Sequence, residues 1–495
     1  MFTDLFQRDP SLSLLTDQYQ LTMAYGYWKT GMAERRAEFH MFYRKNPFRG
    51  GFVVMTGMGT LLEYLQSFRF SASDLDYLAT LTDRSEAPLF EPAFLDYLGT
   101  MRFTCDIHSI PEGTIVFPNE PLIRVQGPIV QAQLIETLLL NTINFQSLIA
   151  TKTARICHAA QGDPVVDFGL RRAQGLGGLA AARAAYVGGA VGTSNVLAGK
   201  LFGIPVIGTH AHSWVMSFPE ERQAFAAYAH TLPGNCVFLV DTYSSLNGVH
   251  NAIAVARELR EQGHEMLGIR LDSGDLAYFS KRSRQLLDEA GFPQAQIVAS
   301  NELDEYVITS LKLQGARIDI WGVGTKLVTG DGNPALTGVY KLTALENQQG
   351  EWEYKLKLSD TRAKMSVPGL LQVYRHYHEG HLMMADVIAD HREIPETIDR
   401  IIDPNDNLRR KLLKRSVRFE PLLKPLYREG ELQSDPPDLQ QIRQHFQDQL
   451  TLLDDSHKRF EYPHIYPVGL SPKLNALRDA MIEREREQLS EQNSE

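Results

Sequence analysis

Short apolar runs alternate with amphipathic segments through the middle of this 495-residue chain. The seven runs of strand length are 165–168, 190–193, 204–207, 237–240, 266–271, 296–299 and 318–323. Six of them are followed by a segment whose apolar residues have helical spacing. This alternation predicts right-handed strand–helix units on a parallel sheet. The number of units favours an α/β fold built on an irregular (β/α) barrel, with a doubly wound open sheet as the alternative.

The flanking segments have other patterns. Apolar and polar residues alternate in strand fashion near 37–45, and a long helix is predicted over 129–160; strand patterns return after residue 335, and charged helical patterns follow from about 405. We therefore expect four segments: an N-terminal β-sheet-rich α+β domain with a connecting helix (1–160), the barrel (161–330), return strands that pack on the N-terminal domain (331–400) and a small helical C-terminal appendage (401–495).

Charge excludes some classes of partner. The chain has 50 basic and 60 acidic residues, a formal net charge of −10, so we expect no general binding to nucleic acid or acidic membranes, although a small phosphate pocket is allowed. Polar residues interrupt the apolar run 134–150, which therefore does not read as a membrane span. Three widely spaced cysteines and an N-terminus without a signal-peptide pattern predict a cytoplasmic protein.

Each of the seven predicted strands ends at or just before a polar residue that can take part in chemistry. In chain order these are Asp167, Thr193, Thr209, Asp241, Asp272, Ser300 and Thr325. Polar residues often end strands for structural reasons alone. In a barrel, however, the carboxyl ends of the strands meet on one face, where active sites lie. All seven together predict a site on that face.

His210 and His212 follow the third run, in the sequence GTHAHSW. Alternate residues of an extended segment point to opposite sides, and no further histidine or cysteine cluster completes a zinc site. A nucleophilic or general-base histidine is favoured, with Asp241 at the end of the next strand as its partner.

Two other strand ends carry candidate anion-binding groups. In IRLDSGD, Arg270 can hold a carboxylate or phosphate through two hydrogen bonds, while Asp272 and Asp275 can bind Mg²⁺ or stabilise positive charge on a sugar; a helix cap with a salt bridge is the structural alternative. In GVGTK, Gly324 and Thr325 can approach a phosphate.

Six motifs in this order resemble the nicotinate phosphoribosyltransferase family. They are LLTDQYQLTMAYGYW, DFGLRRAQG, GTSNVLAGKLFGIPVIGTHAHSW, IRLDSGDL, DIWGVGTKLVTG and KLSDTRAKMSVPG, which together span roughly residues 11 to 370. The resemblance implies an irregular α/β barrel and a homodimer with shared sites. It also implies that nicotinate and phosphoribosyl pyrophosphate react to nicotinate mononucleotide and pyrophosphate, coupled to ATP hydrolysis with Mg²⁺.

The resemblance also assigns roles to residues. His212 would be phosphorylated by ATP and oriented by Asp241, and Asp272 would lie near the ribosyl centre or the magnesium. The remaining assignments group by ligand: Tyr19 of the partner subunit, Phe168, Thr209 and Arg270 for nicotinate, and Thr325, Gly324 and Arg171 for phosphoribosyl pyrophosphate. Arg44 and Lys45 would reach the phosphates of phosphoribosyl pyrophosphate across the dimer.

Ser194 bears on the choice of substrate. The related nicotinamide enzyme carries an acid in this loop, whereas a serine hydroxyl can donate to the carboxylate of nicotinate.

Three alternative functions stay open. They are a phosphoribosyltransferase that uses nicotinamide or quinolinate, a lyase or aldolase with Lys326 as its only Schiff-base candidate, and a non-catalytic barrel scaffold.

Overall fold

The computed structural model describes residues 12–359 and 365–492. Residues 360–364, within the motif KLSDTRAKMSVPG, lie outside the described residues. The chain forms two compact units. Unit 1 takes the described residues of Met1–Ser147, Ala335–Asp438 and Gln444–Glu495, and unit 2 comprises Leu148–Pro334 and Leu439–Arg443. The four predicted segment boundaries stay a prediction.

Unit 2 is built on a parallel sheet in which the first strand pairs with the last. The spatial order is β7-β6-β11-β10-β9-β8, with strands β6 (Val165–Asp167), β7 (Gly192–Thr193), β8 (Val237–Leu239), β9 (Gly268–Leu271), β10 (Gln296–Ala299) and β11 (Ile320–Val323). Trp321 of β11 lies opposite Val165 of β6, so the sheet curls back on itself. The predicted irregular barrel is confirmed.

The barrel has one open seam, between its third strand and β8. The predicted strand 204–207 is reduced to a single bridge in which Val206 pairs with Thr193. Thr193 donates its N–H to Pro205 O, and Ile207 donates to Thr193 O. No strand pairing joins this segment to β8 among the described residues. The short run Ile204–Ile207 thus hydrogen-bonds as a strand on one edge only.

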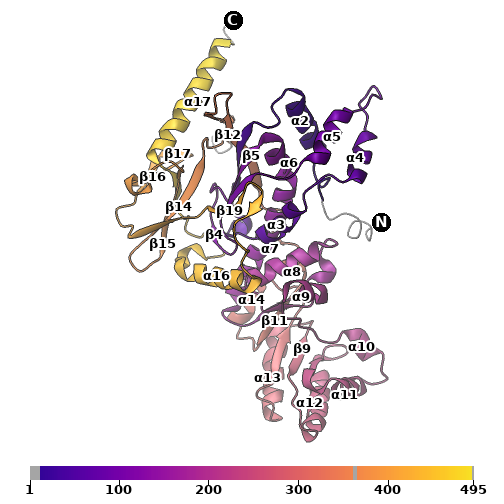
Figure 1. The fold of residues 1–495 in the computed structure, drawn as a ribbon. Helices are drawn as coiled ribbons and strands as arrows, with labels where there is room; N and C mark the ends of the chain where they lie inside the picture. Colours follow the sequence, from indigo (N-terminus) through magenta and orange to yellow (C-terminus); the bar gives the residue numbers. More distant parts are fainter. Residues whose placement is uncertain (1–11, 360–364, 493–495) are drawn as a thin grey trace. The chain divides into compact units, whose positions relative to one another are not determined.

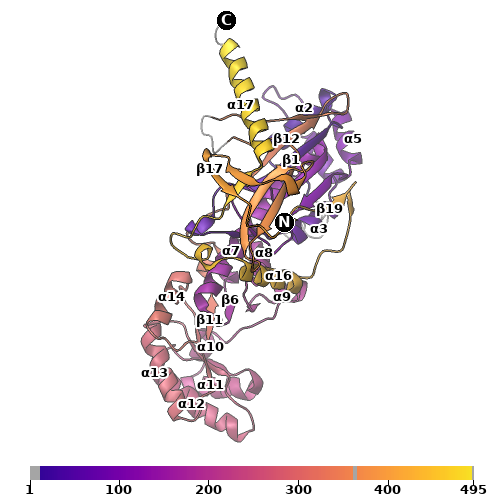
Figure 2. The same cartoon turned by 90° about the vertical axis from the view of Figure 1, so that its left-hand side faces the viewer.

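Helices follow the strands along the chain. They are α8 (Gly177–Val187), α9 (Val196–Phe202), α10 (His212–Met216), α11 (Glu221–Thr231), α12 (Ser245–Glu261), α13 (Leu276–Glu289), α14 (Glu305–Leu313) and α15 (Thr325–Val328), with the 3₁₀ turn η2 (Leu170–Arg172). Figures 1 and 2 show α12 and α13 side by side, and both helices contact β9. The side of α12 that carries Val249, Ala252 and Ala256 is buried, as its helical spacing predicts.

Unit 1 contains a seven-stranded sheet assembled from distant parts of the chain. Its order is β13 (Trp352–Tyr354), β12 (Gly338–Glu346), β1 (Arg36–Tyr43), β5 (Ile123–Pro128), β3 (Asp106–Ser109), β19 (Lys424–Arg428) and β20 (Glu431–Leu432). β2 (Val53–Val54) and β4 (Ile115–Val116) form a separate pair. Helices of unit 1 include α2 (Gln18–Lys29), α3 (Met58–Gln66), α4 (Ala72–Ala79), α5 (Pro92–Thr100) and α6 (Ile129–Leu134), and α7 (Glu136–Ala160) continues from unit 1 into unit 2.

A second sheet of unit 1 has six strands. Its order is β17 (Asp406–Leu412), β16 (Arg400–Asp403), β21 (Val468–Leu470), β15 (Met383–Asp390), β14 (Leu371–Tyr377) and β18 (Arg418–Pro421). Arg375 of β14 and Asp386 of the neighbouring β15 form a fully buried ion pair, 2.6 Å from Nη2 to Oδ2. Tyr466 donates to the same carboxylate. These partners supply the hydrogen bonds that buried charges require.

One part of the predicted helical appendage is wrong. The helices α16 (Leu439–Leu452) and α17 (Pro472–Gln492) are present, but NLRRKLLKR lies largely in the strand β17. In helical form this segment would need a buried apolar face, and Leu408 is 90% exposed. The segment instead pairs with β16, where Ile401 lies opposite Lys411 and is itself buried. Strand pairing by β16 therefore outweighs the helical pattern of charges.

Candidate active site

His212 is the first residue of α10, in the loop that follows the open seam. Its Nδ1 atom lies 3.1 Å from the hydroxyl of Thr242, and its Nε2 atom lies 3.6 Å from Oδ2 of Asp272. The imidazole is 41% exposed, so an incoming group can reach it. A histidine that is hydrogen-bonded at Nδ1, faces a carboxylate at Nε2 and is open to solvent is suited to nucleophilic chemistry.

Asp241 does not hold His212 in the way the sequence predicted. Among the described residues it is Thr242 and Asp272 that contact the imidazole. Asp241 Oδ2 instead accepts the backbone N–H of Asp272 and the hydroxyl of Ser273. Since β8 and β9 are neighbours, the N–H groups past the end of β9 lie within reach and need an acceptor. Asp241 therefore orders the loop that carries Asp272.

Arg270 is the most heavily constrained side chain of the site. Its Nε donates to Ser300 at 2.8 Å, its Nη1 to the hydroxyl of Thr209 at 3.0 Å and its Nη2 to Asp272 Oδ1 at 2.9 Å. A guanidinium has five N–H groups. Two therefore remain for a ligand after these three bonds, which is the number that a carboxylate accepts in a forked contact.

Phe168 lies beside this guanidinium. The Arg270 Cζ atom is 5.5 Å from the centroid of the ring. A Cβ atom at position 322 would come within 2.5 Å of two atoms of the same ring, so the glycine of β11 allows Phe168 its place. A flat aromatic ring next to a fixed cation is suited to binding an aromatic carboxylate.

Asp272 is held in its ionised form. Burial acts to raise the pKa of its carboxyl group, but the Ser300 hydroxyl, the Arg270 guanidinium and His212 outweigh burial, and the pKa lies below the ordinary value. Ser300 donates to Asp272 Oδ1 while it accepts from Arg270 Nε. Ser300 thus fixes both the anion and the cation. The sequence placed Ser300 at a strand end but gave it no role, and it did not single out Thr242.

Asp167 and Thr193 form a buried pair at the ends of β6 and β7. The Thr193 hydroxyl donates to Asp167 Oδ2 at 2.7 Å, and the Gly169 N–H donates to Oδ1 at 2.8 Å. Ser194 donates its backbone N–H to the carbonyl of Asp167, and its side chain is half-buried. These contacts fix the backbone on both sides of Phe168 and of Ser194.

Thr325 and Gly324 stand at the end of β11, where α15 begins. The Thr325 hydroxyl lies 3.4 Å from Glu302 Oε1. A Cβ atom on residue 324 would approach the Phe168 carbonyl oxygen to 3.3 Å, so this turn packs closely against the end of β6. Arg171 is exposed in η2, which follows β6. The structure therefore brings these three predicted phosphate-binding residues to the ends of two adjacent strands.

Asp275 has a structural function in this arrangement. It is the N-cap of α13, and its Oδ1 accepts the N–H of Tyr278 at 2.9 Å. Within residues 12–359 and 365–492, no group of three or more His, Cys, Asp or Glu side chains is arranged to hold a metal ion. Among the described residues, Asp272 and Asp275 are therefore not part of a metal site formed by protein side chains alone.

The remaining predicted residues belong to unit 1. Tyr19 is 49% exposed on α2, and burial of the rest of the ring is the main reason why its pKa is raised. Arg44 and Lys45 follow β1; Lys45 is exposed, while Arg44 is half-buried and its Nε has no hydrogen-bond partner among the residues that the structure describes. The ligand-binding roles of these three residues stay predictions.

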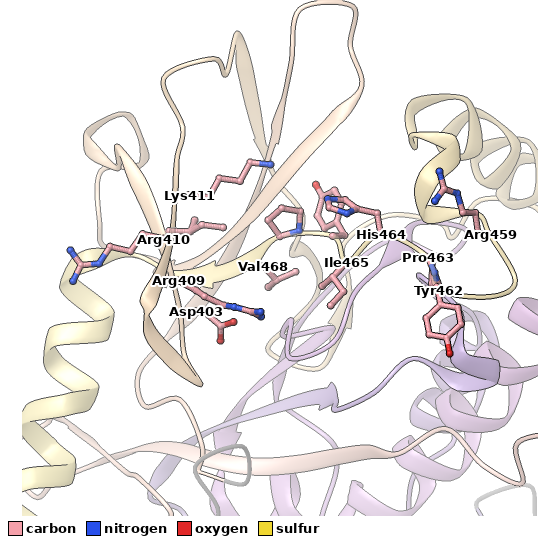
Figure 3. A pocket seen from close by; sticks show the side chains of 13 residues that line it. Asp403, Arg409, Arg410, Lys411, Arg459, Tyr462, Pro463, His464, Ile465 and Val468 are labelled. Atoms are coloured by element: carbon pink, nitrogen blue, oxygen red, sulfur yellow. The ribbon is translucent and has the colours of Figure 1, made fainter.

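Unit 1 also has a cavity of about 550 Å³ with many cations in its lining. Figure 3 shows Arg410 directed away from the other labelled side chains, whereas Arg409 lies beside Asp403. Lys411 donates to the Met384 carbonyl, and Arg410 donates to that of Asn407. Two of the four cationic side chains of the lining are therefore bonded to backbone carbonyl groups.

Unit 2 is an α/β-barrel enzyme whose strand ends present a cation, an aromatic ring and a reactive histidine. Comparison with solved structures places it among phosphoribosyltransferases. The crystal structure of human nicotinic acid phosphoribosyltransferase superposes with a TM-score of 0.82 at 32% identity, over 94% of this chain and 99% of that one. A nicotinate-nucleotide pyrophosphorylase from Pyrococcus furiosus shares the fold, with a TM-score of 0.68 at 21% identity.

The chain belongs to the nicotinate phosphoribosyltransferase family. The models of the family's N-terminal domain, of the family itself and of its C-terminal domain match residues 14–144, 164–353 and 371–478. A nicotinate phosphoribosyltransferase of Bacillus subtilis is 44% identical over 94% of both chains. That of Caenorhabditis elegans is 36% identical over 93% of this chain and 92% of its own. No described helix is long and apolar enough to span a membrane.

Proposed function

We propose that this chain transfers the phosphoribosyl group of phosphoribosyl pyrophosphate to nicotinate, giving nicotinate mononucleotide and pyrophosphate for NAD salvage. The observation that carries the proposal is the Arg270 guanidinium, held by Ser300, Thr209 and Asp272 with two N–H groups to spare. It would bind the carboxylate of nicotinate while Phe168 stacks on the pyridine ring.

The transfer itself would depend on positioning and on charge. The pyridine nitrogen attacks the anomeric carbon as pyrophosphate leaves, and positive charge develops on the ribosyl ring. Asp272 is ionised, as its lowered pKa requires, and would stabilise that charge. Thr325, Gly324 and Arg171 would hold the ribose phosphate, and Arg44 and Lys45 of the partner subunit would contribute positive charge near the phosphates.

ATP would act through His212. A ring nitrogen attacks the γ-phosphorus, ADP leaves, and water later cleaves the N–P bond to release phosphate. The hydrogen bond between Nδ1 and Thr242 would orient the imidazole, and the carboxylate of Asp272 faces its Nε2 atom. The phosphoryl group would change the charge next to Asp272 and so couple ATP cleavage to the transfer.

Mg²⁺ would enter with phosphoribosyl pyrophosphate, where it neutralises charge on the leaving pyrophosphate. The residues present suit this limited role. Asp275 Oδ1 caps α13, which leaves its Oδ2 for a metal that is bound mainly by substrate and water, whereas Asp272 Oδ1 is taken by Arg270 and Ser300 and its Oδ2 faces His212.

The proposed active form is a cytoplasmic homodimer whose partner subunit supplies Tyr19. Leu15, Tyr19 and Met23, spaced by four residues, form an apolar stripe along and just before α2 that is 41–49% exposed. A stripe of this kind is suited to a protein–protein contact. The net charge of −10 argues against nucleic acid as a partner.

The test measures product formation from phosphoribosyl pyrophosphate with nicotinate, nicotinamide and quinolinate in parallel, each with and without ATP and Mg²⁺. We expect turnover of nicotinate, stimulated by ATP and dependent on Mg²⁺. Turnover of nicotinamide or quinolinate instead would overturn the proposed substrate, and no turnover of any of the three would favour the scaffold alternative.

A further inference from the structure

The open seam of the barrel leaves backbone groups of β8 without a neighbouring strand. Consecutive N–H groups of a strand point to opposite edges. Val240 donates to Arg270 O of β9, so the N–H of Leu239 faces the seam. A buried N–H group without a partner would cost stability.

A side chain takes the place of the absent strand. Nε2 of His210 accepts the Leu239 N–H at 3.2 Å. The histidine is 8% exposed and lies among aromatic rings of α11 and β8, with its centroid 4.9 Å from that of Tyr228 and 5.9 Å from that of Phe225. Burial lowers the pKa of His210 to about 4, which keeps the imidazole neutral and Nε2 able to accept.

The segment that His210 anchors carries two residues of the site. Thr209, the preceding residue, accepts from Arg270, and His212, two residues later, contacts Thr242 and Asp272. Thr242 follows β8, the strand to which His210 is bonded. The His210–Leu239 bond therefore lies between the loop that holds His212 and the strand that holds the partner of His212.

We propose that His210 is a positioning residue: its neutral imidazole closes the barrel seam and thereby fixes His212 against Thr242 and Asp272. The inference rests on the proposed function of His212. It accounts for the two histidines of GTHAHSW with separate functions, the first as a buried acceptor and the second as the phosphoryl acceptor. Replacing the ring by a side chain without an acceptor should loosen the loop without removing any proposed substrate ligand.

Three variants test this. H210L removes the acceptor, H210Q restores one on a longer flexible side chain, and F292L truncates a core residue before β10 as a matched control for lost stability. The assay measures phosphoenzyme formation from γ-labelled ATP and, separately, nicotinate turnover without ATP. We expect H210L to slow phosphorylation about tenfold or more, H210Q to recover to within about threefold of wild type, and F292L to remain near wild type.

Equal phosphorylation rates in H210L and wild type would overturn the proposal. The proposal would also fail if H210Q, or the control F292L, were slowed as much as H210L. Amide hydrogen exchange on the full-length variants gives a readout that does not depend on catalysis: exchange at Leu239 and over 208–216 should rise in H210L and fall again in H210Q. If wild type is never phosphorylated, the proposed function of His212 fails, while exchange still decides whether His210 orders the loop. Should H210L not fold, H210M, whose sulfur is a weak acceptor, replaces it.

Discussion

Nε2 of His212 lies 3.6 Å from Oδ2 of Asp272, although the two residues follow different strands of the barrel. The contact joins the group proposed to take a phosphoryl group from ATP to the group proposed to stabilise the ribosyl centre. A change of charge on the imidazole is therefore felt by the carboxylate directly, because two groups at this separation interact strongly in a partly buried site. The functions proposed for the two residues can be tested separately by substitution.

Replacing His212 by alanine should abolish the stimulation by ATP and leave a slow transfer. The variant retains Arg270, Phe168 and Asp272, which would still bind and orient nicotinate and the sugar. Product formation with and without ATP, measured on one enzyme preparation, checks this. Full stimulation by ATP in H212A would remove His212 from the proposed role.

Replacing Asp272 by asparagine should lower kcat/KM for nicotinate by about 100-fold, because the side chain keeps its shape but loses the charge that faces the ribosyl centre. D275N is the matched control, since asparagine also caps helices well and α13 should stay intact. At saturating Mg²⁺ we expect near-normal kcat in D275N and a higher Mg²⁺ requirement. An equal fall in both variants would contradict the separate functions assigned to the two acids.

Replacing Arg270 by lysine should raise KM for nicotinate by about 100-fold, the size expected when a forked, charge-assisted contact is lost. An ammonium group cannot bond Ser300, Thr209 and Asp272 and still present two donors. S300A should cause a smaller rise, because it loosens Arg270 without removing it. Steady-state kinetics at varied nicotinate measure both, and an unchanged KM in R270K would overturn the assignment of the carboxylate site.

Replacing Ser194 by aspartate should shift the substrate preference from nicotinate toward nicotinamide. A carboxylate at this position repels the acid and can accept from the amide. The ratio of kcat/KM for the two substrates is the measurement, with S194A as the control that removes the hydroxyl without adding charge. A ratio equal to that of wild type in S194D would place Ser194 outside the pocket.

The free energy of unfolding should decrease as the pH is lowered, in part because of His210. Its pKa is lowered to about 4 in the folded chain, whereas in the unfolded chain it is close to 6.5. The unfolded chain therefore binds a proton between pH 6.5 and 4 that the folded chain does not, so stability is full above pH 6.5 and falls as pH drops toward 4. At pH 5 this amounts to about 2 kcal/mol.

The measurement compares the change in melting temperature between pH 7.5 and pH 5 in wild type and in H210Q. Glutamine does not titrate, so the variant should lose less stability over this range than wild type does. An equal change in both proteins would mean that the pKa of His210 is close to its ordinary value.

The sequence by itself determined the barrel. Each strand run between residues 165 and 323 is a continuous apolar stretch with a polar residue at its end, and parallel strands that are buried on both faces impose that pattern locally. Family motifs likewise lie in continuous stretches, so Arg270, Phe168, His212 and Thr325 could be named from residue order alone. The pattern around 406–412 misled because charged residues with interspersed leucines suit a helix, whereas pairing with the distant strand β16 decides the outcome.

Only the tertiary structure decided which of the strand-end residues meet. Asp241 bonds the loop of Asp272, Thr242 holds His212 and Ser300 joins Arg270 to Asp272, because these contacts depend on which strands are neighbours and on where the barrel stays open. His210 shows the same limit: its acceptor function exists because the third strand does not pair with β8. Residue type and spacing specify local structure and chemistry, whereas a hydrogen bond across a seam is specified by packing in three dimensions.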